Sequence, residues 1–280
     1  MLPITPTNMF FAKFNTISLI YICLIFYDAV KDVEARRQAR MINGEDVLIE
    51  EFPSHVLISS MYMVNGSRDM YFCGGSLITP THVLTAAHCT IYSDETPMAL
   101  SYYCLPQHIF VRAGVANIHQ RGYDYTVKRI YRHEDYRSQF ELNPWATCDI
   151  AILELNEVVE LGPTQQIIKL PCNIVRLNDE GILLGAGPTS SDPKTVGTLK
   201  KATFKVVPCT KWHQFKVICI RNETVNSVEG DSGSPFIFED RIVGVLAAIP
   251  HKRDFYVVTN VFSYIQWIVN IVGMPEDRPT

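Results

Sequence analysis

The sequence predicts an all-β fold with one helix near its C-terminal end. Short runs of Val, Ile and Leu are broken by Gly, Pro, Asn and Asp, as at 181–188 and 241–246. Such runs are typical of strands that are joined by turns. The one clear helical pattern spans 261–272. The length allows one all-β domain or two small ones, because β-barrel proteins often exceed the usual domain size.

Three short motifs occur in a fixed order: TAAHC at 85–89, CDIAI at 148–152 and EGDSGSP at 229–235. A serine hydroxyl is a poor nucleophile at neutral pH. It needs an imidazole to take its proton and a buried carboxylate to hold that imidazole in the right tautomer. We therefore predict that His88 is the base, Asp149 the acid that orients it, and Ser232 the nucleophile.

From Arg40 to Val272 the chain resembles the chymotrypsin/trypsin-like serine proteases. Three further segments match this family in order: CGGSLI at 73–78, FVRAG at 110–114 and YIQWI at 264–268. The resemblance implies two packed six-stranded antiparallel β-barrels and a C-terminal helix. On this basis the protease domain is expected at 41–273, followed by a tail at 274–280.

The first 29 residues are expected to be a secretion signal. Lys13 precedes a mostly apolar stretch at 17–27. That stretch is long enough for a signal core but short for a membrane span of about 20 residues. Cleavage is expected within 29–35, which makes the protein extracellular. The alternative reading is an uncleaved membrane anchor.

A short propeptide at 30–40 is expected to keep the protein inactive. The basic sequence RRQAR ends at Arg40, where the family carries its activation junction. The resemblance implies that cleavage after Arg40 frees the ammonium group of Met41, which then pairs with Asp231. A buried ion pair is costly unless it is well matched, so this pair can act as a two-state switch. The simpler reading of Asp231 is an aspartate that stabilises a turn.

The resemblance also assigns two disulfides, Cys73–Cys89 beside the predicted base and Cys209–Cys219 in the second barrel. Seven of the eight cysteines remain once Cys23 has left with the signal. No CxxC pair occurs among them, and we therefore expect no metal site. Calcium is not expected either, because Val115 stands where calcium-binding members have Glu.

A secreted chain can also carry a further disulfide and glycans, which the family pattern does not assign. Cys104 and Cys148 flank a strand region and are expected to form a third disulfide, which leaves Cys172 free or paired outside the chain. Asn65 and Asn222 each begin an Asn-x-Ser/Thr sequence and are expected glycosylation acceptors.

The predicted substrate site differs from that of trypsin. The backbone N–H groups of Gly230 and Ser232 are expected to form the oxyanion hole, as in the family. Six residues before Ser232, trypsin-like members carry an Asp that binds Lys or Arg, whereas this chain has Asn226. A neutral amide cannot offset the desolvation of a substrate cation as a carboxylate does. Trypsin specificity is therefore not expected.

The walls of the predicted pocket also differ. Ala247, Ala248 and Ile249 stand where Ser, Trp and Gly are usual, and Tyr256 falls near a second pocket glycine. Ile249 and Tyr256 are expected to narrow the pocket, which favours small or medium apolar residues. Ala247 also lacks a hydroxyl that helps to orient the catalytic Asp in the family. Val228 replaces a cysteine, so one bridge beside the pocket is missing.

Two functions of different classes fit these features. The favoured one is a secreted serine endopeptidase that works through an acyl-enzyme. The other is a weak or inactive homologue that binds or regulates proteins. A net charge of −4 without long basic runs argues against nucleic acid. The expected partners are protein or peptide substrates, an activating protease and a protein inhibitor. We expect a monomer with no cofactor and no membrane contact after signal removal.

Overall fold

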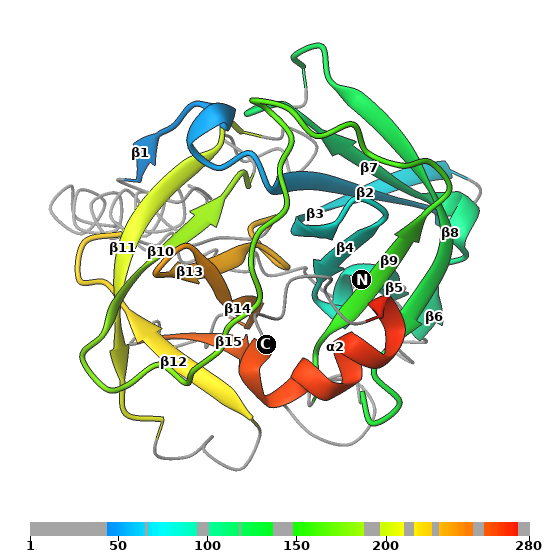
Figure 1. Cartoon of the computed structure of the whole chain (residues 1–280). Coiled ribbons are helices and arrows are strands. Elements are labelled where there is room, and N and C mark those ends of the chain that lie inside the picture. The colour runs from blue at the N-terminus through cyan, green and yellow to red at the C-terminus, as the bar shows by residue number, and fades with distance from the viewer. Residues whose placement is uncertain are drawn as a thin grey trace, which may run out of the picture. The chain divides into compact units, whose positions relative to one another are not determined.

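Strands dominate the computed structural model of the chain (Figure 1). The structure describes residues 44–64, 67–93, 101–117, 119–136, 148–187, 197–209, 216–225, 230–248 and 255–273. The predicted secretion signal and propeptide lie outside the described residues. No helix in these ranges is both long enough and apolar enough to cross a membrane.

The first barrel is a closed antiparallel sheet with the strand order β2-β3-β4-β9-β8-β7. Its strands are β2 (His55–Val64), β3 (Ser67–Thr79), β4 (His82–Thr85), β7 (Ile109–Ala113), β8 (Tyr123–Arg132) and β9 (Ala151–Leu155). In β7, buried Ile109, Val111 and Ala113 alternate with less buried neighbours. This alternation is expected of strands with one face toward a core. The barrel closes where β2 pairs with β7.

The second barrel has the order β11-β10-β13-β14-β15-β12 and closes where β11 pairs with β12. Its strands are β10 (Glu180–Gly185), β11 (Lys200–Val207), β12 (Val217–Arg221), β13 (Pro235–Phe238), β14 (Arg241–Ala248) and β15 (Tyr256–Asn260). A short strand, β1 (Glu45–Asp46), adds to the outside of β11. Each barrel therefore has six antiparallel strands, as predicted.

The remaining elements are short. A two-stranded sheet contains β5 (Ile91–Ser93) and β6 (Ser101–Tyr103). The 3-10 turns are η1 (Ile49–Glu51), η2 (Ala87–Thr90), η3 (Pro106–His108) and η5 (Val261–Tyr264), and η5 leads into α2 (Ile265–Val272). The predicted helix at 261–272 is therefore confirmed, with a 3-10 first turn.

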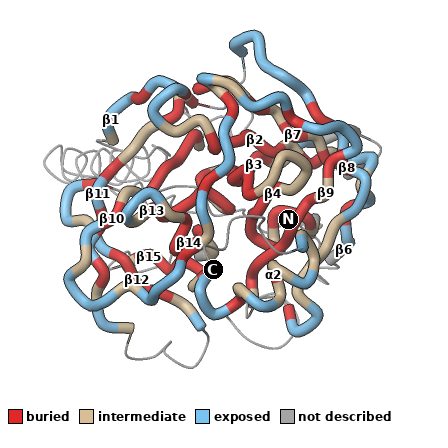
Figure 2. Tube along the Cα trace, viewed as in Figure 1, coloured by how far each residue is buried: buried red, intermediate tan, exposed pale blue. Residues whose placement is uncertain are grey.

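Buried residues extend through the strands of both barrels (Figure 2). One cluster joins Leu77 and Val83 of the first barrel to Leu184 and Ile237 of the second. Ile268 of α2 is fully buried in the same cluster. Full burial of an Ile side chain stabilises a fold by about 1.5–3 kcal/mol. The predicted fold class is confirmed, and this shared core holds the two barrels together.

Candidate active site

His88 and Asp149 lie at the ends of paired strands in the first barrel. His88 is on η2, three residues after the end of β4, and Asp149 lies two residues before the start of β9. Because β4 pairs with β9 in the antiparallel sense, Thr85 lies opposite Ala151 and the two side chains meet at one edge. Asp149 Oδ2 lies 2.7 Å from His88 Nδ1, and Oδ1 accepts the backbone N–H of His88 at 2.9 Å.

This carboxylate is held inside the protein, whereas the imidazole reaches solvent. The side chain of Asp149 is 1% exposed and that of His88 is 25% exposed. Thr259 on β15 donates its hydroxyl hydrogen to the backbone carbonyl of Asp149 at 2.8 Å. The second barrel therefore helps to fix the backbone that carries Asp149. Sequence reasoning missed Thr259, because nothing in its local sequence points to this contact.

The pKa of His88 is raised above 6.5. Burial by itself lowers this pKa because a charged imidazole loses water. The negative charge of Asp149 and its hydrogen bond favour the protonated ring, and together they outweigh the effect of burial. The arrangement thus stabilises the imidazolium that forms when His88 accepts a proton.

Ser232 lies in the tight turn before β13, and the first barrel supports this turn. The N–H of Gly74 on β3 donates to the carbonyl of Ser232 at 2.7 Å. Gly233 has a φ of 77°, a conformation that favours glycine, and a Cβ there would collide with Thr85 and with the carbonyl of Gly74. The turn therefore requires Gly233 in both its conformation and its packing.

The hydroxyl of Ser232 contacts Tyr71 rather than His88. The phenol of Tyr71 on β3 donates to Ser232 Oγ at 3.5 Å. His88 Nε2 has a polar contact with Cys89 Sγ at 3.9 Å. Within the described part of the chain, no hydrogen bond joins Ser232 Oγ to His88 Nε2. Sequence reasoning missed Tyr71, which lies two residues before Cys73 on the same face of β3.

Asp231, next to Ser232, is fully buried. Its Oδ1 accepts the backbone N–H of Gly187 at 2.8 Å. A buried carboxylate is costly unless charged or hydrogen-bonded groups compensate it. Arg40 and Met41, which the sequence connects with Asp231, lie outside the described residues.

Comparison with known proteins gives the same family as the motifs. The family model named Trypsin matches residues 43–268, which is most of the chain. The chain belongs to the trypsin family. A trypsin from Phaedon cochleariae is 27% identical to this chain, and the match spans 90% of this chain and 96% of that trypsin. Melanization protease 1 from Drosophila melanogaster is 30% identical, and the match spans 83% of this chain and 66% of that protease.

A solved structure shares the fold of this trypsin-family chain. It is the crystal structure of the scabies mite inactivated protease paralogue S-D1, with a TM-score of 0.68 and 24% identity. The match covers 85% of this chain and all of that one. At this identity the likeness concerns the fold alone.

One of the predicted pocket residues of this trypsin-family chain lies in the second barrel's core. Tyr256 on β15 is 1% exposed, and its ring packs edge to face on Phe204 with centroids 5.4 Å apart. Asn226 and Ile249 lie outside the described residues, as does Val228. Ala247 on β14 is described and is partly exposed.

The structure confirms two expected disulfides and corrects the third. Cys73 is bonded to Cys89 and Cys209 to Cys219. Cys104, Cys148 and Cys172 are free thiols, so the expected Cys104–Cys148 bridge is wrong.

The two thiols of the expected third bridge have different surroundings. Cys104 is buried beside Arg132, whose guanidinium donates to the Cys104 carbonyl at 3.0 Å. Cys148 lies near the hydroxyl of Tyr264. The spacing of Cys104 and Cys148 along the sequence does not reveal that their side chains have different neighbours.

The described part of the chain offers one cluster with metal-ligand spacing, formed by Cys73, His88 and Cys89. Both of its sulfur atoms belong to the disulfide. Neither is a thiolate, which is the form of cysteine that binds a metal. The cluster is therefore part of the catalytic neighbourhood rather than a metal centre.

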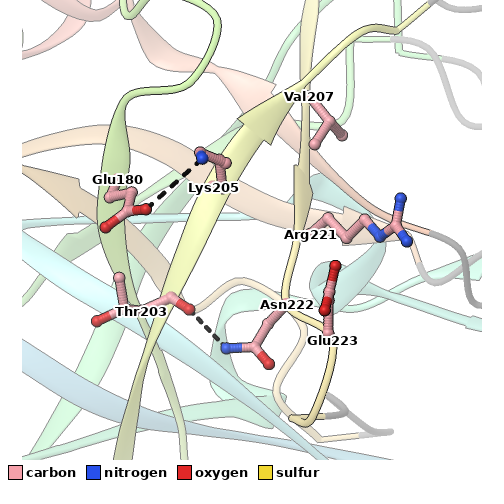
Figure 3. A pocket seen from close by; sticks show the side chains of 7 residues that line it. All are labelled: Glu180, Thr203, Lys205, Val207, Arg221, Asn222 and Glu223. Carbon is pink, nitrogen blue, oxygen red and sulfur yellow. Dashed lines mark hydrogen bonds and ion pairs between the residues drawn. The ribbon is translucent and has the colours of Figure 1, made fainter.

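A separate hollow of about 320 Å³ lies over β10, β11 and β12 of the second barrel (Figure 3). Its lining carries both signs of charge, and Lys205 lies 3.9 Å from Glu180. None of the predicted catalytic residues lines it. It therefore has no part in the candidate active site.

Asn222, an expected glycosylation acceptor, lies at the edge of this hollow (Figure 3). Its Nδ2 donates to the Thr203 carbonyl at 2.7 Å, and its Oδ1 accepts the N–H groups of Thr224 and Val225. A sugar would replace one Nδ2 hydrogen and leave the other to donate. The second expected acceptor, Asn65, lies outside the described residues.

Proposed function

We propose that this trypsin-family chain is a secreted serine endopeptidase in which Ser232, His88 and Asp149 perform the chemistry. The observation that carries the proposal is the 2.7 Å contact between His88 Nδ1 and buried Asp149. It leaves Nε2 as the nitrogen that can accept the proton of a serine. The turn that carries Ser232 is hydrogen-bonded, through Gly74, to the first barrel, which also carries His88 and Asp149.

In the proposed reaction, Ser232 Oγ attacks the carbonyl carbon of the scissile peptide while its proton passes to His88 Nε2. The resulting imidazolium is stabilised by the charge of Asp149. His88 then gives the proton to the leaving amine as the C–N bond breaks, which leaves an acyl-enzyme. Water, activated by His88, hydrolyses the ester and restores Ser232. Because Oγ is hydrogen-bonded to Tyr71 and not to His88 in the structure, Ser232 must first turn toward Nε2.

The negative charge of the tetrahedral intermediate needs hydrogen-bond donors. We assign this role to the backbone N–H groups of Gly230 and Ser232. No hydrogen bond within the described residues engages either group. Loss of one such donor typically lowers the rate by about two to three orders of magnitude. Gly230 has a φ of 92°, so the backbone here adopts a conformation that favours glycine.

We further propose that the chain is made as a zymogen, cut after Arg40, and that the Met41 ammonium pairs with Asp231. The complete burial of Asp231 supports this, because a buried carboxylate favours a cationic partner. We also propose a preference for small or medium apolar residues before the scissile bond. Its basis is Asn226 together with Ile249, as the sequence suggests; Tyr256, which was also expected to narrow the pocket, packs in the core of the second barrel instead.

A catalytically weak homologue that binds other proteins is the second candidate function. One observation favours it: Ser232 Oγ is hydrogen-bonded to Tyr71 and, within the described residues, not to His88. A fluorophosphonate probe separates the candidates because it reacts with an activated serine whatever the pocket prefers. The form beginning at Met41 should be labelled and Ser232→Ala should not. Equal signals from both proteins would refute the endopeptidase.

A further inference from the structure

We propose that Tyr71 is a positioning residue that restrains the Ser232 hydroxyl in a resting orientation in which it is not hydrogen-bonded to His88. This inference rests on the proposed endopeptidase function. It starts from the Tyr71 hydroxyl, which donates to Ser232 Oγ at 3.5 Å. No hydrogen bond between described residues connects that Oγ to the imidazole.

The backbone around Tyr71 and Ser232 fixes the positions of these two residues relative to each other. Tyr71 and Gly74 lie on the same strand, β3, and Gly74 bonds directly to the carbonyl of Ser232 at 2.7 Å. Cys73, between them, is fixed to Cys89 by a disulfide. The strand that carries the phenol is therefore attached to the segment that carries His88 and to the turn at 230–234 that carries Ser232, the nucleophile turn.

The chemistry of a hydroxyl explains how such a restraint works. An oxygen of this kind accepts up to two hydrogen bonds and donates one. The phenol of Tyr71 occupies an acceptor position of Ser232 Oγ and favours the rotamer that faces β3. Proton transfer requires Oγ within about 2.6–3.2 Å of Nε2. The reaction therefore requires Ser232 to leave Tyr71, and removal of the phenol hydroxyl favours the reactive rotamer.

The test measures the rate of fluorophosphonate labelling for Tyr71→Phe and for the unmodified protein. Both proteins are first processed after Arg40. The variant keeps the ring and loses only the hydroxyl. At 3.5 Å the bond is long, so we expect labelling to accelerate about two- to fivefold. For peptide hydrolysis, kcat should rise while KM stays the same.

The matched control is Tyr131→Phe, in which the lost hydroxyl donates to Glu154 on β9 instead. Its labelling rate should equal that of the unmodified protein. Unchanged or slower labelling of Tyr71→Phe would overturn the restraint. An equal acceleration in Tyr131→Phe would also overturn it, since the effect would then not depend on Ser232.

A second measurement does not depend on turnover. NMR of isotope-labelled imidazole nitrogens reports whether His88 Nε2 accepts a hydrogen bond, at a pH where the ring is neutral. The Nε2 resonance should move toward the hydrogen-bonded position in Tyr71→Phe. An unmoved resonance overturns the restraint. If neither protein is labelled by the probe, the endopeptidase proposal fails, while this resonance still decides the role of Tyr71.

Discussion

Gly74 of the first barrel and Ser232 of the second are joined by a backbone hydrogen bond of 2.7 Å. The approach is so close that a Cβ at position 74 would collide with the hydroxyl of Ser234. Ser234 is fully buried and has little room to move aside. The lack of a side chain at Gly74 therefore allows the two barrels to meet at the nucleophile turn.

Gly74→Ala should displace this turn. We expect the free energy of unfolding to fall by about 1–3 kcal/mol, as is usual for overpacking. Fluorophosphonate labelling should slow at least about tenfold, because small displacements of reacting groups are costly to rate. The control is Gly162→Ala, where the added methyl group enters open space. Normal stability and labelling in Gly74→Ala would show that the turn accommodates a methyl group.

Activity should depend on pH through His88. The base must be neutral, and its pKa is raised, so the labelling rate should increase with pH through an inflection above 6.5. Asp149→Asn should lower the inflection and reduce the maximal rate by about four orders of magnitude, as in another Ser-His-Asp enzyme. The raised pKa also means that the pair stabilises the fold below pH 6.5 and loses this effect as the pH rises through the folded pKa. An inflection below 6.5 would contradict the described geometry.

His55 should make the first barrel sensitive to acid. It is 2% exposed, its Nδ1 lies 3.1 Å from the Val56 carbonyl, and its Nε2 has no partner within the described residues. Burial lowers the pKa of His55 from 6.5 to about 4. Because the unfolded chain binds this proton more readily, the free energy of unfolding should fall between pH 6.5 and 4, by about 3 kcal/mol in total.

Denaturant titrations at several pH values measure this effect. His55→Gln should flatten the dependence over that range, even if its stability is lower throughout. His119→Gln, which changes an exposed residue, should reproduce the unmodified curve. Parallel curves for all three proteins would mean that His55 does not carry the acid sensitivity.

The three free thiols should differ in reactivity. Iodoacetamide should modify exposed Cys172 first in the folded protein. Cys104 should react slowly, because it is buried and burial raises the pKa of its thiol. In denaturant without reductant, mass spectrometry of the signal-free protein should find Cys104, Cys148 and Cys172 all modified. Modification of Cys172 alone would instead reveal a disulfide between the other two.

Specificity should differ from that of trypsin. With Asn226 in place of an acidic residue, the processed protein should cleave after Ala, Val or Leu at least about tenfold better than after Arg, a difference of about 1.4 kcal/mol. Asn226→Asp alone should not produce good cleavage after Arg. Peptide libraries measure both, and efficient cleavage after Arg by the unmodified protein would show that the pocket residues are misassigned.

The fold and the family could be predicted because they depend on local motifs in a fixed order. The same motifs indicated His88 and Asp149, which lie 2.7 Å apart in the structure. The contact of Tyr71 with Ser232 joins positions 161 residues apart, and no local pattern encodes it. The Cys104–Cys148 bridge was wrong because separation along the chain does not give distance in space.

The division of the site between the barrels has a consequence for biosynthesis. A ribosome delivers the chain from its N-terminus, so His88 and Asp149 emerge well before Ser232. The strand β3 that supports the nucleophile turn is also made long before that turn exists. An unfinished chain that has emerged only as far as Asp149 therefore lacks Ser232. The three residues of the candidate site can come together only after position 232 has been made.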